Sequence, residues 1–198
     1  KCRLKLAELG VTASMRALYI ERDDEAFGNL ERYLDSATPD TVSAKCFHGD
    51  FVDLREQILT WSGRDAFTFF FIDPKGWKSI GIEKLRPLLQ RPRSEFLINF
   101  IYDFINRTAS MAEWQSDIAE FLGVPIGAVQ ELEHHSPQDR EEKLLGHYRS
   151  SLKAALPPQR SPFIGRTAYV RVLDPSRERA KYHLVYLSSH PKGTIEFM

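Results

Sequence analysis

Cysteine, net charge and long apolar segments are all scarce in this sequence of 198 residues. Its two cysteines, Cys2 and Cys46, are too few for a disulfide framework or a cysteine-based zinc site. Lysine plus arginine and aspartate plus glutamate both number 27, so no overall charge attracts nucleic acid or acidic lipid, and such binding must be local. With no secretory signal and no long apolar segment, we expect a cytoplasmic protein without a membrane span.

Glycine-rich phosphate-binding loops are missing as well. Residues 1–20 contain only Gly10, and the sequence has no G-x-G-x-x-G motif, which disfavours a nicotinamide-dependent dehydrogenase. The segment that ends at Gly10 has the pattern of the end of a helix. We therefore expect the first strand of the fold, and the glycine loop after it, upstream of Lys1.

The most apolar stretch is Phe67–Ile72, in which five of six residues are large and apolar, and it is followed by Asp73-Pro74-Lys75-Gly76. This composition is typical of a mid-sheet strand that is covered on both faces and ends in a tight turn. Ligands of open α/β sheets bind beyond the carboxyl ends of the strands, which makes Asp73 a candidate site residue. The alternative is that Asp73-Pro74-Lys75-Gly76 serves only as a turn.

Strands and helices alternate through the first half of the chain. We predict strands at Ala17–Ile20, Val42–Phe47, Phe67–Ile72 and Phe96–Ile101, with helices between them. The alternation predicts an α/β fold with a Rossmann-like, doubly wound and mostly parallel sheet. The helix after the first of these strands is expected to end at Thr38-Pro39. It carries an apolar stripe that we expect in the core, made of Ala26, Phe27, Leu30, Tyr33, Leu34 and Ala37.

This pattern predicts that the chain is divided into three segments. Residues 1–106 form the Rossmann-like core, and residues 107–160 form a helical insertion. Within the insertion, one helix is predicted to begin at a capping box around Ser110 and to end at Gly123-Val124-Pro125. Another is predicted to begin at Ser136-Pro137. Residues 161–198 then supply two β runs that complete the sheet as an antiparallel hairpin.

Acidic residues end three successive predicted strands: Glu21, Asp50 and Asp73. In one parallel sheet they would lie at the same edge. A carboxylate there can accept hydrogen bonds from both ribose hydroxyls, and Asp50 can hold an adenine amino group while Phe51 packs on the base. The alternative is that such acids cap the helices that follow them. The ordered series favours a nucleoside cofactor.

Polar residues also follow the strand next to Asp73. Asn99, Tyr102, Asp103 and Asn106 either orient a substrate or satisfy the backbone of an irregular turn. Arginines in the same region predict either a phosphate-binding rim or a solvated surface; they are Arg86, Arg91, Arg93 and Arg107. No metal site is predicted, because the neighbouring histidines His134 and His135 lack a third ligand at metal spacing.

Several segments resemble known motifs. Ile20-Glu21-Arg22-Asp23, Gly49-Asp50-Phe51 and Ile72-Asp73-Pro74 resemble successive motifs of class I S-adenosylmethionine-dependent methyltransferases. Three longer segments resemble the three-Cys-motif partner family, usually written TcmP; they are 71–77, 95–107 and 189–193. Proteins of that bacterial family have a methyltransferase-like fold and are known mainly from pairing with an iron–sulfur-type protein that carries the three cysteines.

The resemblance implies an S-adenosylmethionine pocket in which Glu21 holds the ribose and Asp50 and Phe51 hold the adenine. It implies that Asp73 and Pro74 face the substrate, and we place Trp77 with them at the reacting centre. We expect nucleic acid as the substrate, with contacts from the polar residues after the neighbouring strand: Asn99, Tyr102, Asp103, Asn106 and Arg107. Trp77 would replace the tyrosine of the usual Asp-Pro-Pro-Tyr string, since Lys75 and Gly76 occupy its last two places.

The missing glycine loop leaves two alternatives. Either the loop lies upstream of Lys1, or the pocket cannot close and the chain is a non-catalytic docking partner of the three-cysteine protein.

Overall fold

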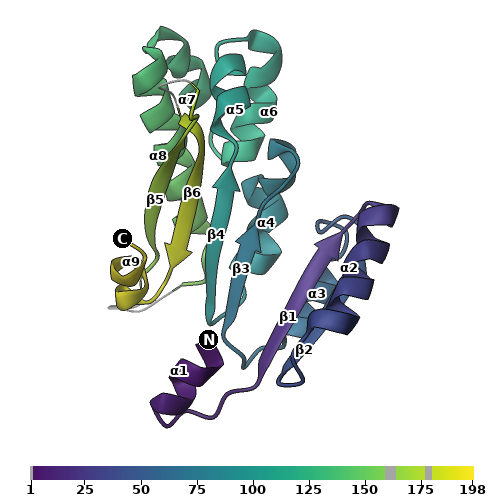
Figure 1. Cartoon of the computed structure of the whole chain (residues 1–198). Coiled ribbons are helices and arrows are strands. Elements are labelled where there is room, and N and C mark those ends of the chain that lie inside the picture. Colours follow the sequence, from purple (N-terminus) through teal and green to yellow (C-terminus); the bar gives the residue numbers. More distant parts are fainter. Residues whose placement is uncertain (1, 159–163, 177–179) are drawn as a thin grey trace. The chain divides into compact units, whose positions relative to one another are not determined.

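The protein is mixed α/β, and its computed structural model describes residues 2–158, 164–176 and 180–198 (Figure 1). It divides into two compact units, Lys1–Trp61 and Ser62–Met198, which we describe separately. Within the described ranges, no helix is both long enough and apolar enough to cross a bilayer.

Unit 1 has a two-stranded parallel sheet. Strand β1 (Met15–Glu21) pairs with β2 (Val42–His48), so that Met15 lies opposite Val42 and Glu21 lies opposite His48. The helices are α1 (Cys2–Glu8), α2 (Asp24–Ala37) and α3 (Arg55–Ser62), the last of which ends at the boundary with unit 2.

Local signals set the ends of the helices in unit 1. The predicted helix end at Gly10 is confirmed, because α1 ends just before it and Gly10 has φ +73°, a value that favours glycine. Asp23 caps α2 by accepting the N–H of Ala26 at 2.9 Å. Helix α2 ends before Thr38-Pro39, as predicted, because proline disfavours helical backbone at the residue before it.

The apolar stripe of α2 is less buried than predicted. None of its residues is fully buried, and Tyr33 is 65% exposed. The expectation that these side chains form core was therefore wrong, since they are at most partly buried. The physical reason is that α2 packs on a sheet of two strands, which is too narrow to cover a whole helix face.

Unit 2 contains a four-stranded mixed sheet in the order β3-β4-β6-β5. Its strands are β3 (Thr68–Ile72), β4 (Ser94–Phe100), β5 (Arg166–Leu173) and β6 (Ala180–Ser188). Strands β3 and β4 are parallel, whereas β6 is antiparallel to both β4 and β5. The predicted C-terminal antiparallel pair is thus confirmed, although residues 177–179 between its strands lie outside the described residues.

The position predicted for Phe67–Ile72 was wrong. We expected a mid-sheet strand covered on both faces of one large sheet, but β3 is an edge strand, and the described strands form two sheets. Phe67, Phe69 and Phe71 are 63%, 51% and 61% exposed. A continuous apolar run indicates a strand but does not specify its neighbours, since those are chosen by distant segments.

The helices of unit 2 supply its core. Strand β3 leads through η1 (Trp77–Ile80) and α4 (Ile82–Leu89) to β4, and β6 leads to α9 (Pro191–Phe197). The described part of the predicted insertion is helical and follows α5 (Tyr102–Thr108); its elements are α6 (Ala112–Leu122), α7 (Ile126–Gln130), η2 (Glu131–His134) and α8 (Pro137–Ala155). The boundary predicted at 160/161 falls outside the described residues.

Two predicted helix starts had different outcomes. Ser136 caps α8, with Pro137 at its first position, as predicted. Helix α6 instead begins after Met111 without a side-chain cap, so the capping box at Ser110 was wrong. Its end at Gly123, with φ +66°, follows the usual left-handed termination.

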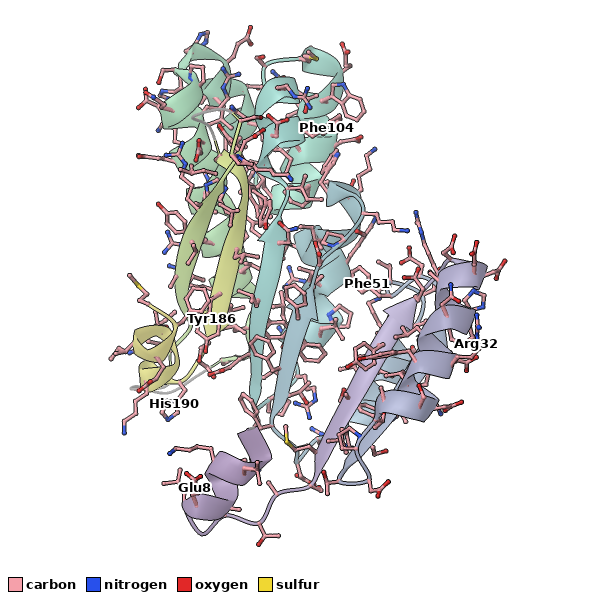
Figure 2. All side chains as sticks on the ribbon, viewed as in Figure 1. Glu8, Arg32, Phe51, Phe104, Tyr186 and His190 are labelled. Atoms are coloured by element: carbon pink, nitrogen blue, oxygen red, sulfur yellow. The ribbon has the colours of Figure 1, made fainter. Side chains whose placement is uncertain are left out.

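One face of the four-stranded sheet lies against the helices. Phe96, Ile98 and Phe100 of β4 are at most 1% exposed, and their partners on β6 are equally buried. Because β6 runs opposite to β4, α9 follows β6 at the end of the sheet where β4 begins. Figure 2 accordingly shows His190, just before α9, far from Phe104 of α5, which follows the other end of β4.

Candidate functional site

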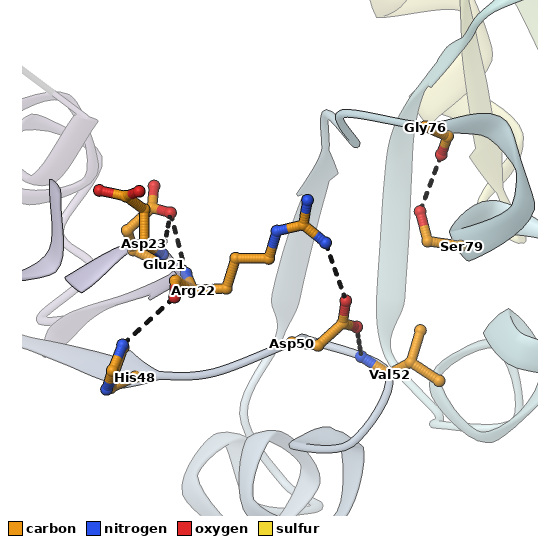
Figure 3. A network of polar contacts seen from close by, with 8 residues as sticks. All are labelled: Glu21, Arg22, Asp23, His48, Asp50, Val52, Gly76 and Ser79. Carbon is orange, nitrogen blue, oxygen red and sulfur yellow. Dashed lines mark hydrogen bonds and ion pairs between the residues drawn. The ribbon is translucent and has the colours of Figure 1, made fainter. Parts of the chain in front are cut away.

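Unit 1 brings together two of the three predicted acids. Because β1 and β2 are parallel with Glu21 opposite His48, Glu21 and Asp50 lie at the same edge of that sheet. Arg22 lies between them, with its guanidinium 3.8 Å from Asp50 Oδ2 (Figure 3). Both carboxylates are only partly exposed. This edge therefore presents two acids and one arginine.

Backbone groups already use part of each carboxylate (Figure 3). Glu21 Oε1 accepts the N–H groups of Arg22 and Asp23 at 2.8 and 2.9 Å. Asp50 Oδ1 accepts the N–H of Val52 at 2.8 Å, which is an Asx turn rather than a helix cap. Both acids thus stabilise the turns after their strands, and these contacts also hold the carboxylates in place.

Aromatic rings lie close to the same edge. Phe51, predicted to pack on adenine, is half-buried beside Asp50. The ring of His48 stacks on Phe27 with centroids 4.7 Å apart, and His48 Nε2 is 3.1 Å from Asp24 Oδ1. The region therefore combines aromatic rings with carboxylates.

Unit 2 holds the third acid. Asp73 follows β3 and is exposed, and Asn99 Nδ2, near the end of the adjacent strand β4, donates a hydrogen bond to Asp73 Oδ1 at 2.6 Å. The prediction that Asn99 lies beside Asp73 is confirmed. Asn99 Oδ1 is buried and has no hydrogen-bond partner among the described residues.

The other predicted substrate residues lie on α5. Tyr102 is 5% exposed, and its hydroxyl donates to the carbonyl of Pro137 at 3.3 Å. Asp103 and Arg107 form an ion pair at 3.3 Å, one helical turn apart. Asn106 has a buried Oδ1 without a partner in the described part of the chain. Arg107 is thus well placed for solvent or substrate, whereas Tyr102 serves the packing.

Trp77 is part of an aromatic cluster. Its ring is 8% exposed and contacts Phe104, Trp114 and Phe121, with centroids 5.2–6.4 Å away. Pro74, three residues earlier, is half-buried. Stacking of Trp77 on a flipped base stays a prediction, and it requires this cluster to open.

The four arginines predicted as a rim have different surroundings: Arg86 lies in α4, Arg107 lies in α5, and Arg91 and Arg93 lie between α4 and β4. Arg91 is 6% exposed and donates to backbone carbonyls, including those of Gly63 and Ala66 at 2.9 and 2.7 Å. Arg86 pairs with Glu83 on its own helix, and Arg93 donates to a backbone carbonyl at 2.9 Å. The sequence left two alternatives for these arginines, a phosphate-binding rim or a solvated surface. Neither describes Arg91, because its side chain is buried and holds backbone carbonyls in place.

The C-terminal motif 189–193 has a packing role that the sequence did not reveal. A methyl group on Gly193 would lie 2.6–2.8 Å from three oxygens: Ser188 Oγ, Glu95 Oε1 and Tyr186 Oη. Ser188 Oγ also donates to Glu95 Oε1 at 2.8 Å. His190 Nδ1 accepts the N–H of Lys192 and so caps α9. The motif therefore fastens α9 to β6, at the opposite end of the sheet from Asp73.

Metal-binding side chains are dispersed. Across the ranges that the structure describes, no three side chains among histidine, cysteine, aspartate and glutamate are grouped to hold a metal ion. Cys46 is a free, half-buried thiol, and burial, followed by the nearby Glu31 and Glu21 carboxylates, raises its pKa. A raised pKa disfavours the thiolate that metal binding requires.

Comparisons of the chain with models of known families, with curated proteins and with solved structures return no match.

Proposed function

We propose that the chain is part of a methyltransferase-like protein of the three-Cys-motif partner type, which binds S-adenosylmethionine and acts on or near nucleic acid in the cytoplasm. The observation that supports this most directly is the parallel register of β1 and β2, since it brings Glu21 and Asp50 to one edge. Carboxylates at the carboxyl ends of adjacent parallel strands suit the ribose and the base of a nucleoside.

The arrangement of strands supports the finer fold that we propose, a Rossmann-like, doubly wound sheet. Unit 1 contributes a parallel β-α-β segment, and unit 2 begins with another, from β3 through α4 to β4. The antiparallel strands β6 and β5 then extend the sheet beyond β4. Each unit thus contains one parallel β-α-β segment, the repeating element from which such a fold is built.

In the proposed reaction, bound S-adenosylmethionine supplies an electrophilic methyl group. The protein has mainly to hold the acceptor in line with it. Asp73 would accept a proton from the acceptor or hold its amino group. The hydrogen bond from Asn99 engages one oxygen of that exposed carboxylate, and the other oxygen would take this role.

Calorimetric titration of the full-length protein with S-adenosylhomocysteine tests the cofactor. We expect binding by the wild type, and a loss of affinity of about tenfold or more in Glu21→Gln and Asp50→Asn, because hydrogen bonds to charged groups contribute about 1.5–3 kcal/mol. Asp35→Asn, at an exposed position of α2, is the matched control and should bind as the wild type does. No binding by the wild-type protein would refute the proposal.

A second candidate is a non-catalytic docking partner of the iron–sulfur-type three-cysteine protein. It is favoured by the exposed rings of Phe69 and Phe71 on β3 and of Phe67 just before it, since exposed apolar patches commonly mark protein interfaces. Under this function, Phe71→Ser should weaken co-purification with the three-cysteine protein, whereas Asp73→Ala should leave both pairing and biological activity intact. Loss of activity in Asp73→Ala with unchanged pairing would favour the enzyme.

A further inference from the structure

A buried carboxylate joins four elements of unit 2. Glu141 of α8 has Oε1 at 2.9 Å from His183 Nε2 on β6 and at 3.3 Å from Arg171 Nε on β5. Tyr102, the first residue of α5, packs its ring edge-on to that of His183, with centroids 5.3 Å apart. We call Tyr102, Glu141, Arg171 and His183 the Glu141 cluster.

Three members of the cluster are shielded from solvent, whereas the side chain of Arg171 is 48% exposed. His183 is 1% exposed, Tyr102 is 5% exposed, and the side chain of Glu141 is 13% exposed. Burial, followed by the Glu141 carboxylate, raises the pKa of Tyr102, so its hydroxyl stays protonated. Little water therefore reaches His183, Tyr102 and Glu141, and their main polar contacts are with other protein groups.

The contacts of His183 determine its tautomer. The Glu141 carboxylate can only accept a hydrogen bond, so His183 Nε2 must carry the hydrogen, and Nδ1 of the neutral ring is then a lone pair. Nδ1 is buried and has no partner among the described residues. A second proton on the ring would therefore create a buried N–H without an acceptor, which is costly.

Each neighbouring element contributes groups that act on a charged ring. Glu141 comes from α8, Arg171 and Tyr169 come from β5, Tyr102 comes from α5, and the apolar Phe100 comes from β4. Arg140 of α8 acts on Tyr102. Burial lowers the pKa of His183, and Arg171 acts in the same direction, while Glu141 opposes them. Folded unit 2 therefore keeps this imidazole neutral at pH values where an exposed histidine is protonated.

Helix α5 is the element most directly affected. It carries Asp103, Asn106 and Arg107, and it contacts both β6 and α8. We propose that the Glu141 cluster is a proton-sensitive lock on α5. While His183 is neutral, the cluster holds the start of α5 against β6 and α8. Acidification releases α5, because the His183 ring gains its second proton only in the opened form. This inference does not depend on the proposed cofactor.

Hydrogen exchange of the α5 amides in the full chain tests the lock. After correction for intrinsic rates, the opened population should rise up to about tenfold per pH unit between about pH 6.5 and 5.5, because opening takes up one proton. His183→Gln, which cannot titrate, should abolish this dependence. His134→Gln, at an exposed position of η2, should keep it. An equal pH dependence in His183→Gln and the wild type, or none in the wild type, would overturn the proposal.

A measurement on the unaltered protein covers the case in which His183→Gln does not fold. Nitrogen chemical shifts of the histidine rings report the tautomer directly. We expect a neutral His183 ring with its hydrogen on Nε2 at pH 7. A doubly protonated ring, or a hydrogen on Nδ1, would overturn the lock.

Discussion

The same substitution, glycine to alanine, should have opposite effects at two helical positions of unit 2. Gly193 lies in α9, where an added methyl group would meet three side-chain oxygens at 2.6, 2.7 and 2.8 Å. One of them, Ser188 Oγ, belongs to a short, fully buried side chain that cannot move away easily. Gly146 lies inside α8, and beyond its chain neighbours and the backbone of its own helix, no described atom is within 4 Å of its added methyl group.

The expected magnitudes follow from two opposing terms. Alanine in place of glycine in a helix gains about 0.5–1 kcal/mol. Overpacking a tight contact costs about 1–3 kcal/mol, and here it also disturbs the hydrogen bond between Ser188 and Glu95. Gly146→Ala should therefore stabilise the fold by up to about 1 kcal/mol. Gly193→Ala should weaken the attachment of α9 by about 1–2 kcal/mol net.

Two assays separate these effects. Urea unfolding followed by circular dichroism gives the free energy of unfolding of each variant, and hydrogen exchange of the α9 amides gives the local stability of that helix. We expect faster exchange in α9 for Gly193→Ala and unchanged exchange there for Gly146→Ala. If the α9 amides exchanged no faster in Gly193→Ala than in the wild type, the close approach of Gly193 to its neighbours would not explain the motif.

Three further predictions concern buried side chains. Tyr148→Phe should lower the free energy of urea unfolding by about 1–3 kcal/mol, because the fully buried hydroxyl donates to the carbonyl of Ile80 at 2.8 Å; an unchanged value would show that this bond is dispensable. Burial, followed by a neighbouring carboxylate, raises the pKa of Tyr186 to about 12. Since an unfolded tyrosine ionises near pH 10, the unfolded chain loses its proton first, so stability should fall from about pH 10 to about 12. Tyr186→Phe should remove that part of the decline in unfolding experiments at a series of pH values, and equal declines in both proteins would contradict the assignment. Arg91→Met should cost about 2–4 kcal/mol, because it leaves several carbonyls of the loop before β3 without their donor. Arg86→Met, at an exposed ion pair, should leave the midpoint of unfolding nearly unchanged, and equal effects of the two would show that burial of Arg91 is unimportant.

The sequence alone identified the features that depend on a few neighbouring residues. The start of α8 at Ser136-Pro137, the end of α6 at Gly123 and the end of α2 at Thr38-Pro39 all follow from caps, φ preferences and missing N–H groups. The apolar runs likewise marked the strands, and the antiparallel pair near the C-terminus was predicted from its two runs.

The tertiary structure alone decided which distant segments meet. The edge position of β3, the burial of Arg91 and the contact between Glu141 and His183, 42 residues apart, had no local signal. Even the hydrogen bond between Asp73 and Asn99, which we expected, depended on the pairing of β3 with β4. Such contacts result from many weak interactions that are summed over the whole fold, whereas helix ends are decided within one turn of the chain.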